Sequence, residues 1–158
     1  MKFQRILIAI DDSKYAENAA AYGFELAHTF KAQVALVHNT EPIISPATTD
    51  TGMVGSFIPT MSIDEPELIN IQEEYSGKLI DGIVARYGAD LQVTHYDEFG
   101  STADGIIECI AKFNADLVVL GTHSRTGFDR FFMGSVAEDV VRHSPVPVLV
   151  VPLKKEDQ

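Results

Sequence analysis

The chain of 158 residues has few features of secreted or membrane proteins. Its lone cysteine, Cys109, cannot form an internal disulfide, and such cysteine usage fits a reducing compartment. No apolar run approaches the roughly 20 residues that a membrane-spanning helix requires. The first residues lead directly into a strand pattern, without the architecture of a signal peptide. We therefore expect a cytoplasmic protein that does not insert into a membrane.

Basic residues are scarce as well. The chain has 12 Lys and Arg against 23 Asp and Glu, a formal net charge of −11. Phosphate backbones are held chiefly by Lys and Arg, so general binding to nucleic acid or to anionic membranes is not expected. One small anionic ligand stays compatible with this charge, provided that local backbone donors, a nearby arginine or a divalent cation hold it.

The common catalytic signatures are missing. The sequence has no GxxxxGK[ST] run, no GxSxG turn and no CxxC or HxxxH spacing, so it predicts no P-loop hydrolase, serine hydrolase or metal centre. Cys109 lies within a helical apolar pattern, which favours a packed core thiol over a nucleophile. We therefore predict no catalytic residue.

What the sequence does contain is a regular alternation of short apolar runs and amphipathic segments. The predicted strands are 3–10, 33–39, 91–96, 117–120 and 146–151. Four helices separate them: one after Asp12 or Ser13, either of which could cap it, one from Pro66 to Gly88, one capped by Ser101 with Asp104, and one opened by Gly134 and Ser135.

The apolar stripes of the first two helices predict their buried faces. For the first helix these residues are Ala16, Ala19, Gly23, Leu26 and Phe30. For the second they are Leu68, Ile71, Tyr75, Leu79, Ile83 and Tyr87. Strands separated by helices run parallel, which predicts an open, doubly wound α/β sheet with helices on both faces. Residues 1–158 are long enough for one domain with a single substantial core.

Such sheets bind ligands at the carboxyl ends of their strands. Asp11, Asn39, Gly100 and Gly121 lie at the ends of predicted strands, so the fold gathers them on one edge. Gly134 and Ser135 start a helix, and a helix start carries unpaired N–H groups and partial positive charge that can hold an anion. Two other interpretations stay open: Ser135 with Glu138 forms a capping box, and Gly121 only turns the chain.

The segment from Glu41 to Glu65 is different in kind. It contains three prolines and two glycines and has no sustained hydrophobic period. Long loops of this type are usually functional lids or mobile segments, and the apolar residues in this one need a surface to cover. We predict a mobile segment that becomes protected when a ligand binds; a disordered insertion without a role is the alternative.

Three stretches carry a resemblance to a known family: the first strand ending in Asp11, the run GTHSRTGFDRFFMGS and the terminal PVPVLVV. Together they resemble the universal stress protein family over essentially the whole chain. Its ATP-binding members have the loop Gly, two residues, Gly, nine residues, Gly, then Ser or Thr. This chain has Gly121, two residues, Ser124, nine residues, Gly134 and Ser135. Ser124 thus departs from the pattern, and Gly127 follows it as a substitute source of flexibility.

The resemblance implies a Rossmann-like fold, related to the adenine nucleotide alpha hydrolases, with strand order 3-2-1-4-5 and ATP bound between the first and fourth strands. By position, Asp11 would meet the nucleoside and the backbone near Asn39 the adenine. The phosphates would be surrounded by the loop and the helix start: Gly121, Ser124, Arg125, Gly127, Gly134 and Ser135. Asp11 with Asp12 could hold Mg²⁺ through the phosphates; for Asp12 we prefer the interpretation as a plain helix cap.

The implied function is that of an ATP-binding stress-response regulator, with slow ATP hydrolysis in some members. A dimeric interaction module that binds no nucleotide is the alternative. Pro147 lies within the last strand, Val146 to Val151, and proline in a sheet is largely confined to edges. An exposed apolar edge needs a cover, so we predict a homodimer paired through this strand, as the resemblance also implies.

Overall fold

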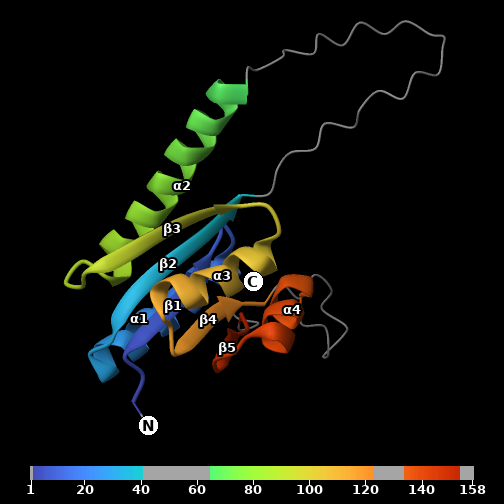
Figure 1. The fold of residues 1–158 in the computed structure, drawn as a ribbon. Coiled ribbons are helices and arrows are strands. Elements are labelled where there is room, and N and C mark those ends of the chain that lie inside the picture. Colours follow the sequence, from blue (N-terminus) through green and yellow to red (C-terminus); the bar gives the residue numbers. More distant parts are fainter. Residues whose placement is uncertain (1, 41–64, 123–133, 154–158) are drawn as a thin grey trace, which may run out of the picture.

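The computed structural model describes residues 2–40, 65–122 and 134–153. Its centre is a parallel five-stranded sheet in the order β3-β2-β1-β4-β5 (Figure 1). The strands are β1 (Arg5–Ile10), β2 (Gln33–Thr40), β3 (Val93–Phe99), β4 (Leu117–Gly121) and β5 (Val148–Val151). This order and the doubly wound architecture confirm the predicted fold class.

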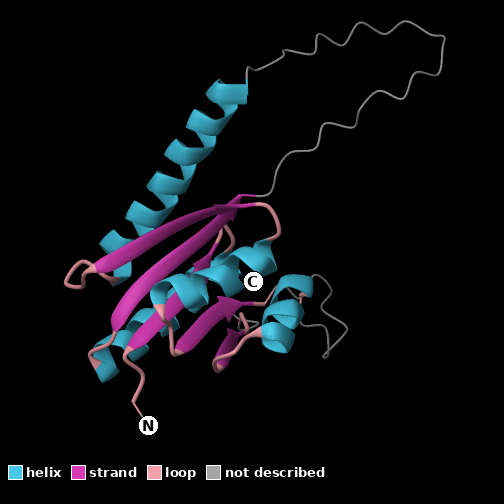
Figure 2. Cartoon of the chain, viewed as in Figure 1, coloured by secondary structure: helices cyan, strands magenta, loops and turns pink. Residues whose placement is uncertain are grey.

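Four helices cover the two faces of the sheet (Figure 2). They are α1 (Lys14–Phe30), α2 (Glu65–Tyr87), α3 (Thr102–Phe113) and α4 (Ser135–His143). Alternate residues of β1 point to opposite faces: Ile6 and Ile8 belong to the core covered by α1 and α2, whereas Leu7 belongs to the core covered by α3 and α4. Because both faces are buried at the centre of the sheet, β1, β2 and β4 contain nearly continuous apolar runs, whereas the edge strand β3 (VTHYDEF) is largely polar.

Helix α1 approaches the sheet through small residues. Its buried residues are Ala16, Ala19, Ala20, Gly23, Phe24 and Ala27. A β-carbon on Gly23 would lie 2.6 Å from Cδ1 and 2.8 Å from Cγ1 of the fully buried Ile8, so a larger residue here would displace that side chain. The predicted face is confirmed at Ala16, Ala19 and Gly23, whereas Leu26 and Phe30 are only partly buried at the margin of the core.

Helix α2 is buried over its C-terminal half. Ile80 and Ile83 are 1% and 7% exposed, whereas Ile71 and Tyr75, predicted to be buried, are 52% and 51% exposed. At about 1.5 Å per residue the helix is roughly 35 Å long, while the seven residues of β3 span only about 23 Å. Its N-terminal half consequently projects beyond the sheet (Figure 1).

All five predicted strands are present, with several ends shifted by one to three residues; the shifted starts of β3 and β5 have a visible cause. β3 begins at Val93 instead of Leu91, because the N–H of Leu91 donates to the carbonyl of Gly88 in a turn (2.9 Å). β5 begins at Val148 instead of Val146, whose N–H donates to the hydroxyl of Ser144 (3.2 Å). The predicted mobile segment lies outside the described residues except for Glu65, which opens α2.

Candidate functional site

The carboxyl edge of the sheet brings several predicted site residues together. Ile10 of β1 pairs with His38 of β2, so Asp11 and Asn39 follow neighbouring positions on adjacent strands. β4 lies on the other side of β1 and ends at Gly121. Gly134 and Ser135 open α4. Three further predicted residues, Ser124, Arg125 and Gly127, lie outside the described residues.

The β1–α1 corner is organised by side-chain caps. The carboxylate of Asp11 accepts the N–H of Ser13 (Oδ1, 2.8 Å), and the hydroxyl of Ser13 accepts the N–H of Ala16 (3.2 Å). Ser13 is thus the N-cap of α1, in extended conformation directly before the helix. The prediction that Asp12 is a plain helix cap is wrong, because its carboxylate instead accepts the hydroxyl of Tyr75 from α2 (3.0 Å).

Metal ligands are sparse at this corner. Among the residues that the structure describes, no three His, Cys, Asp or Glu side chains are grouped as a protein-only metal site would require. Asp11 and Asp12 supply two carboxylates, which suits Mg²⁺ when phosphate oxygens and water complete its coordination. A divalent ion here would therefore depend on a phosphorylated ligand.

Gly121 ends β4 against the first turn of α1. A β-carbon at this position would lie 2.6 Å from both the carbonyl carbon and the carbonyl oxygen of Tyr15. The N–H of the next residue, Thr122, donates to the carbonyl of Val151 in β5 (3.2 Å). Gly121 therefore has a packing role in addition to any role in a loop that binds phosphate.

The side chain of Asn39 is committed to the β3–α3 corner. Its Nδ2 donates to the carbonyl of Gly100 (2.8 Å) and to the hydroxyl of Thr102 (3.4 Å). Its Oδ1 is buried without a hydrogen-bond partner among the described residues and faces the backbone of Gly105, where a β-carbon would collide with it. A ligand at this position would therefore meet the main chain near Asn39 and not its amide.

The start of α4 has no side-chain cap. Gly134 is the N-cap residue (φ −53°, ψ 153°), and it has no side chain to offer. The alternative interpretation of Ser135 and Glu138 as a capping box does not hold, because Ser135 already lies inside the helix and Glu138 pairs with Arg142 (2.8 Å) one turn later. Among the residues that the structure describes, no side chain accepts the N–H groups of this first turn, and such groups can bind water or an anionic ligand.

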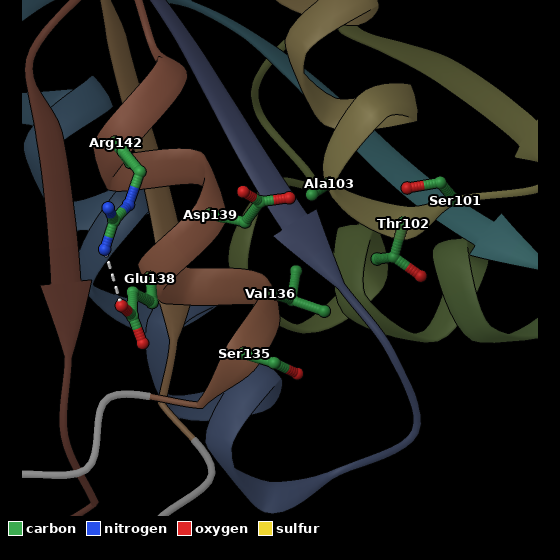
Figure 3. A pocket seen from close by; sticks show the side chains of 8 residues that line it. All are labelled: Ser101, Thr102, Ala103, Ser135, Val136, Glu138, Asp139 and Arg142. Atoms are coloured by element: carbon green, nitrogen blue, oxygen red, sulfur yellow. Dashed lines mark hydrogen bonds and ion pairs between the residues drawn. The ribbon is translucent and has the colours of Figure 1, made fainter.

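A groove of about 420 Å³ lies between the starts of α3 and α4. It is lined by Ser101, Thr102, Ala103, Ser135, Val136, Glu138, Asp139 and Arg142. Val136 and Asp139 point from α4 toward the start of α3, whereas Glu138 and Arg142 pair on the other side of α4 (Figure 3). The groove thus combines hydroxyl groups and two helix starts, and Thr102 connects it to Asn39.

Cys109 is not part of the site. It is fully buried, and its thiol donates to the carboxylate of Glu98 (3.3 Å). Burial, followed by this neighbouring carboxylate, raises the pKa of the Cys109 thiol to about 12. A thiol with such a pKa is not ionised near neutrality, which confirms the predicted packed core thiol.

The comparison with known proteins agrees with this arrangement. The sequence model of the Universal stress protein family matches residues 2–152. The chain belongs to the universal stress protein family. A universal stress protein of Methanocaldococcus jannaschii is 29% identical over 157 residues, which cover 98% of this chain and 85% of that protein. None of the described helices is long and apolar enough to cross a membrane.

Solved universal stress proteins share the fold. One from Burkholderia pseudomallei is 24% identical, with a TM-score of 0.70 over 95% of this chain and 96% of that one. One from Archaeoglobus fulgidus, in complex with dAMP, is 21% identical, with a TM-score of 0.59 over 95% and 98%. Another, in complex with cAMP, is 17% identical, with a TM-score of 0.66 over 96% and 98%. At these identities the likeness establishes the fold, and the nucleotides belong to those two proteins.

Sequence reasoning missed two features of this universal stress protein. The groove between α3 and α4 was signalled by Ser101 and Ser135, which stand at two helix starts on one edge. The hydrogen bond from Tyr75 to Asp12 had no local signal, because 63 positions separate the two residues.

Proposed function

We propose that this universal stress protein binds ATP at the carboxyl edge of its sheet and acts as a stress-response regulator or binding module. The uncapped start of α4 carries the proposal. Gly134 has no side chain with which to cap the first helical turn, and no other side chain of the described residues accepts its N–H groups, at the edge where Asp11 and Asn39 lie. Such a helix start binds phosphate through N–H donors and the helix dipole. Two relatives of the same fold were solved with adenine nucleotides, dAMP and cAMP.

In this proposal each part of the edge meets one part of the nucleotide. Asp11, whose Oδ1 is engaged by Ser13, directs its other oxygen toward the nucleoside. The main chain near Asn39 meets adenine. The phosphates are surrounded by Gly121, Gly134 and Ser135, together with Ser124, Arg125 and Gly127 of the intervening loop. The carboxylates of Asp11 and Asp12 complete the coordination of Mg²⁺ bound to the phosphates.

Charge determines where the affinity must arise. With a net charge of −11 the chain repels a triphosphate at long range. Binding energy therefore comes from short-range donors at the start of α4, which only the phosphates engage. We expect ATP with Mg²⁺ to bind more tightly than AMP.

Calorimetric titration of the protein with ATP tests the proposal. Gly134→Val places branched carbons where the phosphates approach, so two or three hydrogen bonds to a charged acceptor are lost. At about 1.5 kcal/mol each, affinity falls at least about a hundredfold. Gly77→Ala is the matched control, since nothing lies within 4 Å of a β-carbon at that position in α2. Equal ATP affinity in the wild type and Gly134→Val would show that the start of α4 does not bind the phosphates.

Ser124 supports a second candidate, a dimeric interaction module without nucleotide, because it stands where the ATP-binding pattern has glycine. Ser124→Gly separates the two. Little change in ATP affinity means that serine is accepted at this position. ATP binding by Ser124→Gly but not by the wild type, at about millimolar nucleotide, favours the interaction module. No binding by either variant rejects the phosphate-loop assignment.

A further inference from the structure

Two consecutive residues of α2 attach this helix to strand ends on either side of β2. The hydroxyl of Tyr75 donates to Oδ2 of Asp12, which follows β1 (3.0 Å). The hydroxyl of Ser76 donates to Oδ1 of Asp97, which belongs to β3. Since β2 lies between β1 and β3, the middle of α2 spans the carboxyl end of β2 at this point. We call Tyr75, Ser76, Asp12 and Asp97 the α2 clamp.

A buried histidine of β2 lies in the same layer. His38 pairs in register with Ile10 of β1 and with Asp97 of β3, and it is 8% exposed. Its Nδ1 lies 3.9 Å from Oδ1 of Asp97, too far for a hydrogen bond, and has no hydrogen-bond partner within the described ranges. The α2 clamp thus bonds to residues of β3 and of the β1–α1 corner, and it makes no hydrogen bond to Nδ1 of His38 in β2.

The two hydrogen bonds of the clamp differ in exposure. Ser76 is 2% exposed and belongs to the packed interior, whereas Tyr75 is 51% exposed. Water can compete for the bond of Tyr75, so this bond, unlike that of Ser76, can respond to a change in its surroundings. On the C-terminal side of the clamp, α2 is anchored by the buried Ile80 and Ile83. On its N-terminal side, Ile71 is 52% exposed on the projecting part. Tyr75 thus stands at the boundary between the anchored and the projecting halves of α2.

The phenol of Tyr75 is sensitive to both carboxylates of the β1–α1 corner. The hydrogen bond to Asp12 is the largest of the causes that raise the pKa of Tyr75; partial burial and the negative charges of Asp12 and Asp11 add to it. Asp11 is the residue that the proposed function assigns to the nucleoside. The charge of Asp11 therefore reaches Tyr75, whose hydroxyl bonds to the neighbouring Asp12 and makes no hydrogen bond to Asp11 itself.

We infer that Tyr75 is a positioning residue of the nucleotide site: its bond to Asp12 fixes the corner that presents Asp11, and nucleotide binding alters the attachment of α2. This inference rests on the proposed function. Asp12 lies between Asp11 and Ser13, which are themselves joined by a hydrogen bond. Holding Asp12 from outside restricts the corner before the ligand arrives, so less conformational freedom is lost on binding. The projecting half of α2 then responds to the occupancy of the site.

A double-mutant cycle on ATP affinity tests the positioning role. We expect Tyr75→Phe and Asp12→Ala each to weaken ATP binding about three- to tenfold, and the double variant to be no weaker than the poorer single variant. Tyr22→Phe is the matched control, since Tyr22 is also exposed (42%) and lies on α1. Tyr22→Phe should bind ATP with the affinity of the wild type. Additive losses, or an unchanged affinity of Tyr75→Phe, would overturn the positioning role.

A spectroscopic readout tests the coupling to α2. The protein has five tyrosines, and in fluorotyrosine-labelled protein the resonance of Tyr75 is assigned by its loss in Tyr75→Phe. We expect this resonance to move on saturation with ATP in the wild type and to stay still in Asp12→Ala. No movement in the wild type rejects the coupling. A wild type that binds no ATP is a different outcome: it rejects the proposed function itself, and the inference falls with it.

Discussion

The main chain of Tyr15, in the first turn of α1, lies directly against Gly121 at the end of β4. A β-carbon on Gly121 would be 2.6 Å from the carbonyl carbon and oxygen of Tyr15, and backbone atoms in a helix cannot move aside cheaply. The glycine that resembles the start of a phosphate loop is thus also required for the packing of a helix on the sheet.

Gly121→Ala is therefore expected to destabilise the fold even without ligand. Overpacking of this kind costs about 1–3 kcal/mol in the free energy of unfolding, measured by urea denaturation. Gly82→Ala is the control, because no atom lies within 4 Å of a β-carbon there and alanine is the better helix former. Its stability should equal or exceed that of the wild type. An unchanged stability of Gly121→Ala would mean that α1 shifts to accommodate the methyl group.

The homodimer stays a prediction, and the structure shows which residues of β5 would form its interface. β5 is the last strand of the sheet, and Val148, Leu149 and Val150 are only partly buried. Pro147 and Val151 direct their carbonyls to β4 (3.0 and 3.2 Å), so the main-chain groups of Val148 and Val150 point to the far edge. Val150→Pro removes an edge donor without touching the ladder to β4.

We expect sedimentation at about tens of micromolar to show a dimer for the wild type and for Val150→Ala, and a monomer for Val150→Pro. The alanine variant keeps the N–H group and serves as the control. A wild type that is monomeric over this range would remove the predicted homodimer.

Lys31 ends α1 in the left-handed conformation (φ 54°), which is strained for a residue with a β-carbon. Lys31→Gly relieves this strain but increases the freedom of the unfolded chain, so we expect a net stabilisation of about 0.5–1 kcal/mol in urea denaturation. Asn114 ends α3 with nearly the same φ (52°), and asparagine tolerates it better. Asn114→Gly should therefore gain less than Lys31→Gly; the opposite order would contradict the explanation by strain.

His28 should make the stability of the protein depend on pH. Its Nδ1 lies 2.7 Å from the carbonyl of Phe24 and its Nε2 lies 2.9 Å from Oδ1 of Asp90, so both nitrogens donate only in the imidazolium form. The hydrogen bond to Asp90, followed by that to Phe24, raises the pKa of His28 in the folded state. The stabilisation is thus fully present below the unfolded pKa of about 6.5 and is lost as pH rises through the raised folded pKa.

The measurement compares wild type with Asp90→Asn in urea at about pH 5.5 and about pH 8.5. The wild type should be the more stable protein at the lower pH, and the difference should shrink at the higher one. The pKa of Asp90 is lowered by the hydrogen bond from His28, so its own contribution is lost only at still lower pH. A difference that is the same at both pH values would show that the pair does not titrate as described.

Local features were predictable from the sequence because their causes lie within a few residues. The β-branched apolar run that forms β1 and the hydroxyl of Ser101 before α3 are examples; Ser101 does accept the N–H of Asp104 (3.5 Å). The parallel direction of the strands followed from the helices between them. The positions of Asp11 and Gly121 at one edge followed from the ends of their strands. The order of the strands came from the resemblance to a family and not from periodicity.

The tertiary structure alone decided which groups these elements meet. A stripe of apolar residues on α2 does not reveal how far the sheet extends beneath it, so Tyr75 was predicted to be buried and instead lies half exposed at the carboxyl edge. Ser13 and Asp12 are equally good caps by composition, and the backbone of the corner selected Ser13. Asp12 was then left to accept the hydroxyl of Tyr75. A hydrogen bond between segments so distant depends on how a long helix lies across several strands, which no local pattern encodes.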